Sequence, residues 1–254
     1  MTRAAAWAAR AAALTAVLGL LSTALTGCGA APLKLGPSGI DELTIPTPSP
    51  DATDFGSGAS NPWFPLTPGT RWTYRQETVT SSHAVTAEVL DRTRDIDGIA
   101  ATPVRWQVRD RGRARTAMLR WYAVDRAGNV WWLGQRVTHT GLPPLDAIAR
   151  RSFQAGRDGA EAGLVLSAVP RVGDGYFNAQ EPRVVQRRST VISLEGSAAT
   201  PNRIYHDTVV TRDLSTLEPV HTVQSYFARG VGLVAQQDTV SASTSLILLR
   251  VRRP

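Results

Sequence analysis

The feature that most constrains the fold of this chain is the regular alternation of apolar and polar residues after residue 70. In Arg71–Thr78, Trp72 and Tyr74 fall on one face and arginine and threonine side chains on the other. The same period of two recurs in Val85–Val89 and Val104–Arg109. This pattern is typical of antiparallel strands with one buried face, since successive side chains of a strand point to opposite sides.

A β-hairpin is predicted near the middle of the chain. Leu119–Asp125 and Val130–Leu133 read as two strands, and Gly128 in the short connection can adopt a left-handed conformation. Asp125 opens this turn, where an aspartate usually accepts hydrogen bonds from backbone N–H groups. We therefore interpret Asp125 as a turn residue and not as a catalytic carboxylate.

The remaining pattern predicts an all-β domain. The period breaks down between Gly141 and Pro182, where we expect loop, one short helix at Pro144–Phe153 and one strand at Leu164–Val169. Together with the later strand candidates this makes about nine or ten strands, which indicates a strongly bent antiparallel sheet or an open barrel. The later candidates are Val184–Ser193, Ile204–Thr211, Pro219–Phe227, Val231–Gln237 and Leu246–Leu249.

The N-terminus has the order of a secretory signal peptide. Arg3 and Arg10 precede an apolar run over residues 11–24, and no acidic residue precedes Cys28. The run is too short to span a bilayer comfortably. An uncleaved membrane anchor, or a signal peptide cut near Ala30, remains an alternative to the interpretation that follows.

The sequence Leu25-Thr26-Gly27-Cys28 resembles the lipobox of bacterial lipoproteins. The resemblance implies that a diacylglyceryl group is attached to the Cys28 thiol and that the leader is then removed. Cys28 is the only cysteine of the 254 residues, so the mature chain has no disulfide, thiolate nucleophile or cysteine metal site.

Composition and the distribution of proline divide the chain into three parts. We expect a signal peptide at 1–27, a lipidated N-terminus and flexible Pro/Gly/Ser/Thr-rich tether at 28–60, and a single β domain at 61–254. The formal net charge is +7, but Lys34 is the only lysine, and this arginine bias is typical of GC-rich codon usage. We expect no nucleic-acid partner.

Motifs of common enzyme classes are absent or lie in the wrong context. Gly230–Ala235 matches a loosened dinucleotide fingerprint, but no helix-forming segment follows it, so a turn or bulge is favoured. No nucleophile elbow occurs. The histidines form no metal motif, so neither a metal nor a cofactor is expected; they are His83, His139, His206 and His221.

Six of the seven tryptophans lie between residues 63 and 132. We interpret Trp72, Trp106 and Trp121 as core residues, because aromatic residues at alternate strand positions usually pack within the sheet. Trp131 and Trp132 are adjacent and must face opposite ways. One of them therefore lies outside the first core, and this pair is our candidate for ligand-facing aromatics.

Three motifs are similar to those of a broad group of uncharacterised bacterial lipoproteins of actinobacterial type and of secreted β-proteins. They are Phe64–Tyr74, the stretch from Trp121 to Trp131, and Gly230–Val234. The resemblance covers most of the mature domain and implies a lipid-anchored or exported β-sheet protein. It implies no reaction and no catalytic residue.

These observations predict a membrane-anchored lipoprotein on the extracytoplasmic side of the cell membrane, without enzymatic activity. Its concave sheet would bind an apolar or lipid-like small molecule. Two alternatives stay open: a scaffolding module that binds a partner protein or glycan of the envelope, and a hydrolase that uses carboxylates.

The lipid anchor gives the first testable prediction. Cys28→Ser should release the protein from membranes or block removal of the leader, because the thiol is the acceptor of the lipid. Membrane fractionation and the mass of the N-terminal peptide measure this. Unchanged membrane retention with an unchanged N-terminal mass would refute the lipobox interpretation.

Overall fold

The computed structural model describes residues 50–111, 113–140, 151–181, 185–215, 222–240 and 244–254. The only helical segment in these ranges is one 3-10 turn, η1 (Ala52–Asp54), and no helix there could cross a membrane. The fourteen strands are β1 (Arg71–Thr78), β2 (Ser82–Val89), β3 (Arg94–Ile96), β4 (Ile99–Asp110), β5 (Arg113–Val124), β6 (Val130–Thr140), β7 (Phe153–Gln154), β8 (Glu161–Leu166), β9 (Gly175–Glu181), β10 (Val185–Ala199), β11 (Ile204–Ser215), β12 (Thr222–Ala228), β13 (Gly232–Asp238) and β14 (Thr244–Arg252).

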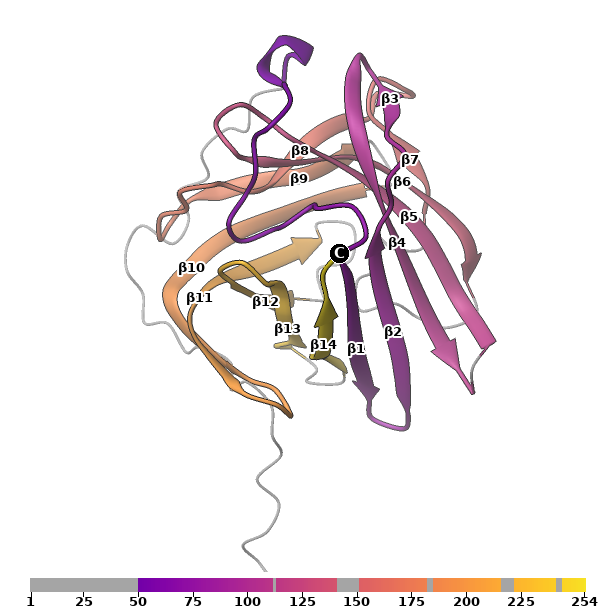
Figure 1. The fold of residues 1–254 in the computed structure, drawn as a ribbon, viewed down its shortest axis with the longest axis vertical. Helices are drawn as coiled ribbons and strands as arrows, with labels where there is room; N and C mark the ends of the chain where they lie inside the picture. Colours follow the sequence, from indigo (N-terminus) through magenta and orange to yellow (C-terminus); the bar gives the residue numbers. More distant parts are fainter. Residues whose placement is uncertain (1–49, 112, 141–150, 182–184, 216–221, 241–243) are drawn as a thin grey trace, which may run out of the picture.

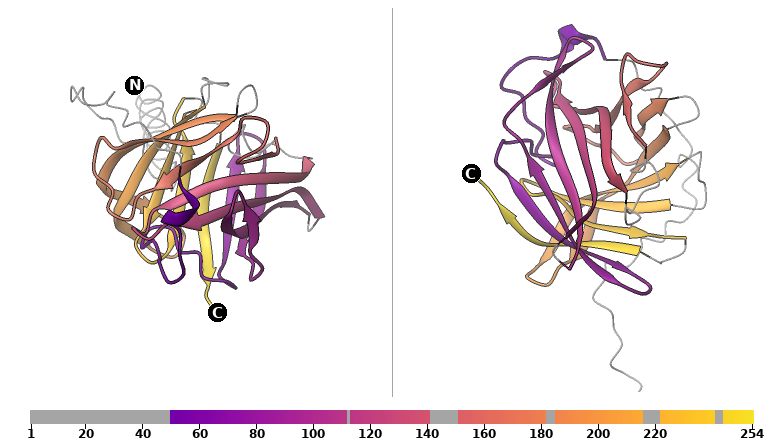
Figure 2. Two further views of the ribbon diagram at one scale, coloured as in Figure 1. Left: turned by 90° about the horizontal axis from the view of Figure 1, so that it is seen from above. Right: turned by 90° about the vertical axis from the view of Figure 1, so that its right-hand side faces the viewer.

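Twelve of these strands form a closed antiparallel barrel. The order around it is β1-β14-β13-β12-β11-β10-β9-β8-β6-β5-β4-β2, and β2 pairs with β1 to complete the circle. The first and last strands lie side by side (Figure 1 and Figure 2). Strands β3 and β7 are short additions that pair with β4 and β6.

The structure confirms the all-β prediction but corrects its details. The sheet has more strands than the nine or ten expected, and it is closed rather than open. Closure depends on the pairing of β2 with β4, in which Val85 lies opposite Val108 and Ala87 opposite Trp106. A closed sheet leaves no long edge with unpaired backbone groups. The predicted helix at 144–153 falls mostly outside the described residues.

The barrel wall is apolar on both faces along β5 and β6. Tyr122 and Trp132 point inward, whereas Trp121, Trp131 and Leu133 point outward. The outward side chains form a second buried cluster, the outer cluster, to which β3 contributes Ile96 and against which Phe55 of the N-terminal segment packs. Its buried members are Ile96, Ile99, Ala101, Trp121, Ala123, Trp131, Leu133 and Ala155.

The segment from Pro50 to Ser60 packs on this outer cluster. Phe55 contacts it and forms a β-bridge with Asp125, and the Arg126 N–H donates to the Asp54 carbonyl at 2.9 Å. The folded part therefore begins before Asn61, and the predicted tether is too long at its C-terminal end. The reason is that Phe55 can bury its ring against a cluster that the sequence pattern did not show.

Residues Asn61–Leu66 cross one end of the barrel, and we name this segment the plug (Figure 1). Asn61 Nδ2 donates to the carbonyls of Gly128 at 2.8 Å and Leu166 at 3.3 Å, on one wall. On the opposite wall, the Gly230 N–H donates to the Pro62 carbonyl at 2.6 Å. The plug is thus fastened to both sides of the end that it crosses, which we call the plug end.

Asn61 holds the plug through both polar atoms of its side chain, because its Oδ1 also accepts from the backbone N–H groups of Trp63 and Phe64. Asn61→Ala should therefore lower the free energy of unfolding by about 1 to 3 kcal/mol, since buried backbone groups lose their partners. Urea denaturation measures this.

The matched control is Asn202→Ala at an exposed turn, where the side chain donates only to the Leu249 carbonyl. Its effect should stay within about 0.5 kcal/mol. Equal effects of the two substitutions would show that the plug does not depend on the Asn61 side chain.

Candidate functional site

The interior of the barrel holds a cavity of about 120 Å³. Its walls come from the inward-facing positions of the strands and from Phe64, Pro65 and Leu66 of the plug. Because side chains alternate along each strand, the cavity is lined by the residues that the period of two places on one face.

Aromatic side chains gather where the cavity meets the plug. The Phe64 ring lies 5.1 Å from Tyr122 and 6.2 Å from Phe227, and Tyr122 stacks on Trp132 at 6.4 Å, measured between ring centroids. Trp72 lines the same region, and its indole N–H donates to the Val231 carbonyl at 2.7 Å. The N–H groups of Trp72 and Trp132 are both bonded to backbone carbonyls, so the rings present apolar faces to the cavity.

A cation lies within the aromatic wall. The Arg120 guanidinium carbon is 5.0 Å from the Trp132 ring centroid and 5.9 Å from the Trp106 ring centroid. Arg120 Nε also donates to Gln135 Oε1 at 3.1 Å. Ring faces attract cations, which helps to compensate for the loss of water around this charge.

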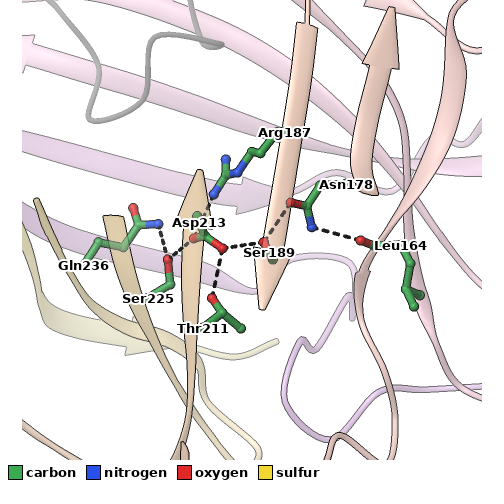
Figure 3. A network of polar contacts seen from close by, with 8 residues as sticks. All are labelled: Leu164, Asn178, Arg187, Ser189, Thr211, Asp213, Ser225 and Gln236. Atoms are coloured by element: carbon green, nitrogen blue, oxygen red, sulfur yellow. Dashed lines mark hydrogen bonds and ion pairs between the residues drawn. The ribbon is translucent and has the colours of Figure 1, made fainter. Parts of the chain in front are cut away.

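The opposite wall, built by β9 to β13, carries a polar network centred on Asp213 (Figure 3). Arg187 Nη2 lies 3.0 Å from Asp213 Oδ2, and Ser225 Oγ donates to the same oxygen at 2.6 Å. Thr211 Oγ1 donates to Oδ1 at 3.1 Å, and the Ser189 hydroxyl also contacts Oδ1.

The network continues in both directions from Asp213. Gln236 Nε2 donates to Ser225 Oγ at 2.8 Å. Ser189 Oγ lies 2.7 Å from Asn178 Oδ1, so its single proton serves either this oxygen or Asp213 at one time. Asn178 is itself fixed because its Nδ2 donates to the Leu164 carbonyl at 2.9 Å.

The Arg187–Asp213 pair is buried, with side-chain exposures of 13% and 6%. A buried ion pair is tolerated when further hydrogen bonds satisfy its atoms, as Ser225 and Thr211 do here. The network therefore holds charged and hydroxyl groups at fixed positions inside an otherwise apolar barrel.

The structure separates the two tryptophans that the sequence singled out. Trp132 lines the cavity, whereas Trp131 lies in the outer cluster, and both are buried. Trp131 Nε1 donates to Asp125 Oδ2 at 2.8 Å. Of the tryptophans interpreted as core, Trp72 and Trp121 are buried, while Trp106 is half-buried and lines the cavity.

The interpretation of Asp125 as a turn residue is confirmed. Its Oδ1 accepts from the Asn129 backbone N–H at 2.9 Å, and Gly128 has a φ of 84°. Gly230, in the turn between β12 and β13, and Gly232, the first residue of β13, also have positive φ, which agrees with the predicted turn or bulge. Cys28 and the residues Leu25, Thr26 and Gly27 lie outside the described ranges.

The two histidines whose side chains the structure describes, His83 and His206, do not line the cavity. His83 and His206 lie on strands and contact Ser81 and Ser197 respectively. Within the described ranges, no group of three or more metal-binding side chains could hold an ion.

Sequence reasoning missed the polar network. The strand predicted over Val184–Ser193 puts Arg187 and Ser189 on the same face, but nothing in the sequence indicates that this face lines the interior. The available signal was the spacing of Thr211 and Asp213, which puts a carboxylate and a hydroxyl on the same face of the next strand. A carboxylate at an inward position needs partners from neighbouring strands, and only the strand order supplies them.

No protein-family model matches the chain, and no curated protein matches it. Among solved structures, an inferred exported protein with a YmcC-like fold from Bacteroides fragilis NCTC 9343 is similar, with a TM-score of 0.40 and 11% identity over 75% of this chain and 99% of that one. An inferred lipoprotein from Parabacteroides distasonis ATCC 8503 is similar with a TM-score of 0.43 and 10% identity, over 77% and 100% of the two chains.

The buried tyrosines give a prediction for alkaline pH. Burial raises the pKa of Tyr74 well above its ordinary value, nearby Tyr205 raises it further, and the hydroxyl donates to the Leu233 carbonyl at 3.1 Å. Burial also raises the pKa of Tyr226. Above about pH 10 the unfolded chain loses tyrosine protons that the folded chain keeps, so stability should fall as the pH rises.

Tyr74→Phe should make the free energy of unfolding fall less steeply with pH, by up to about 1.4 kcal/mol per pH unit. The reason is that the variant lacks one tyrosine proton that the folded chain keeps and the unfolded chain loses. Urea denaturation between pH 9 and pH 12 measures the slope, and comparing slopes separates titration from the packing effect seen at neutral pH. Lys34 is the only lysine, so tyrosines dominate the titration in this range. Identical slopes would contradict the prediction.

Proposed function

We propose that this protein is a bacterial lipoprotein, anchored in the membrane through Cys28, whose barrel binds an apolar or amphiphilic small molecule in its interior. The observation that carries the proposal is the cavity of about 120 Å³ between the aromatic wall and the Asp213 network. Mostly apolar walls with a few fixed polar groups are typical of small-molecule sites.

The size of the barrel supports an interior ligand. The interior of a barrel of about eight strands is just wide enough to be filled by side chains or to hold one small ligand, and the diameter grows with the number of strands. This barrel has twelve, and Phe64 and Leu66 of the plug enter its interior without filling it.

The environment of Asp213 favours binding over catalysis. Both carboxylate oxygens already contact donors from neighbouring strands, namely Arg187, Ser189, Thr211 and Ser225. A general base or nucleophile needs an oxygen that can reach a substrate. Asp213 is instead placed to hold the donors of the network in position.

Native mass spectrometry tests the proposal directly. The mature chain from residue 28, with Cys28→Ser to prevent acylation, should retain a small molecule after purification without detergent. Extraction and mass analysis then give its composition. A folded protein that neither retains nor takes up any apolar or amphiphilic compound would refute the proposal.

Filling the cavity should abolish binding. Val85 is buried and lines the cavity, so Val85→Phe adds a ring where the ligand would lie. We expect uptake of benzene, a single ring of the size that such a cavity can hold, to fall at least tenfold. The matched control is Ala84→Phe, which places the same ring on the exposed face of the same strand and should leave uptake unchanged. Equal uptake by both variants would place the binding site elsewhere.

A further inference from the structure

We propose that the outer face of the barrel, where β1 begins and β14 ends, docks on a membrane surface that carries anionic phosphate head groups. The contact is made by Arg71, Arg250 and Arg252, which we call the arginine triad. This inference goes beyond the proposed function, because it concerns the outside of the barrel and not the interior ligand. Of the proposed function it uses only the anchor at Cys28.

The strand pairing brings the triad together. β1 and β14 are neighbours (Figure 1), and in their register Arg71 lies opposite Arg252. Arg250, two residues earlier on β14, lies opposite Thr73. Trp72 lines the cavity, so Arg71 and Thr73 on either side of it point outward, and so do the residues paired with them. Cβ atoms directly opposite on antiparallel strands are about 5 Å apart and diagonal neighbours about 7 to 8 Å, so the three side chains share one small area.

The charges of the triad have no partner of opposite sign. Within the ranges that the structure describes, these three side chains form no ion pair and no side-chain hydrogen bond. Glu88 lies opposite Arg71 on β2, but its carboxylate is paired with Arg105 at 2.7 Å. Arg75 on the same face is likewise paired with Glu77 at 2.7 Å. Like charges opposite each other destabilise a strand pair, so an anionic ligand on the triad would relieve this repulsion.

A phosphate group has the chemistry that the triad can bind. The planar guanidinium group of arginine donates through a fork of N–H groups that matches two phosphate oxygens, and it keeps its charge at every physiological pH. All three residues are exposed, and none of them lines the interior cavity. They stand on an open sheet face, where they can meet phosphates that are spread over a surface.

The proposed anchor favours a membrane as the source of these phosphates. From Cys28 to Pro50 the chain advances by 22 residues. At about 3.4 Å per residue, this length reaches at most about 75 Å. An anchored domain therefore stays close to a surface that presents many phosphates at once. Each arginine near an anionic membrane strengthens binding about fivefold, so three contribute on the order of a hundredfold.

Vesicle co-sedimentation tests the proposal with the mature chain from residue 28, in which Cys28→Ser prevents acylation. An equal mixture of phosphatidylcholine and phosphatidylglycerol should bind the chain, whereas phosphatidylcholine alone should not. Binding should fall as sodium chloride is raised from about 0.05 to 0.5 M, because salt screens interactions between exposed charges. Equal binding to both kinds of vesicle, or binding to neither, would overturn the proposal.

Substitution of the triad connects the binding to these side chains. Replacing all three arginines together, by Arg71→Gln, Arg250→Gln and Arg252→Gln, should weaken the affinity for the anionic vesicles on the order of a hundredfold. The matched control removes the same charge at three other exposed positions and should stay within about threefold, since charges more than a Debye length from the membrane are screened. Its substitutions are Arg113→Gln, Arg126→Gln and Arg157→Gln. Equal losses in the two variants would show that binding follows net charge alone, and the triad would not be the docking site.

A soluble phosphate compound is separated from a membrane by calorimetric titration of the unsubstituted chain with inorganic phosphate. We expect no saturable binding with a Kd below about 1 mM. Tighter binding that the triad variant loses would assign the triad to a soluble ligand and overturn membrane docking.

Two measurements on the triad variant keep this proposal separate from the proposed function. Its melting temperature should not fall, because the substitutions remove a repulsion from an exposed face. Its uptake of benzene should equal that of the unsubstituted chain, because the cavity is unchanged. Loss of vesicle binding together with loss of benzene uptake would mean that the barrel itself is disturbed and would contradict a role of the triad confined to the outer face.

Discussion

The pairing of β2 with β4 is the interaction on which the rest of the structure depends. Without this pairing, β2 would bond only to β1 and would be the edge strand of an open sheet. With it, twelve strands form one closed circle. A circle of this size has an interior wider than its own side chains can fill. The plug and the polar network follow from that geometry, because the space must be partly filled and any polar group that points into it must find a partner.

The plug and the Asp213 network occupy the barrel interior in different ways. The plug contributes apolar rings and satisfies its own backbone through Asn61 and the turn glycine Gly230. The network places an ion pair and several hydroxyl groups on the inner face, and its hydrogen bonds join neighbouring strands of the wall from β9 to β13. Residues of both the plug and the network line the cavity.

How much of this could be predicted from the sequence depends on the range of the interactions involved. The hairpin at Gly128 and the alternation in β1 are local, and both were predicted correctly. Strand β9 was missed because Gly175 and Asn178 break the apolar pattern, although Asn178 is buried as part of the network. The opposite directions of Trp131 and Trp132 were predictable from the strand period. Which of them faces the interior depends on neighbouring strands, as do closure and the contacts of Asp213.

The segment Pro50–Phe55 and the plug are both held by the turn between β5 and β6. Phe55 forms a β-bridge with Asp125, the Arg126 N–H donates to the Asp54 carbonyl, and Asn61 of the plug donates to the Gly128 carbonyl. One hairpin turn therefore positions both segments, and a movement of this turn would release the outer covering and the plug together.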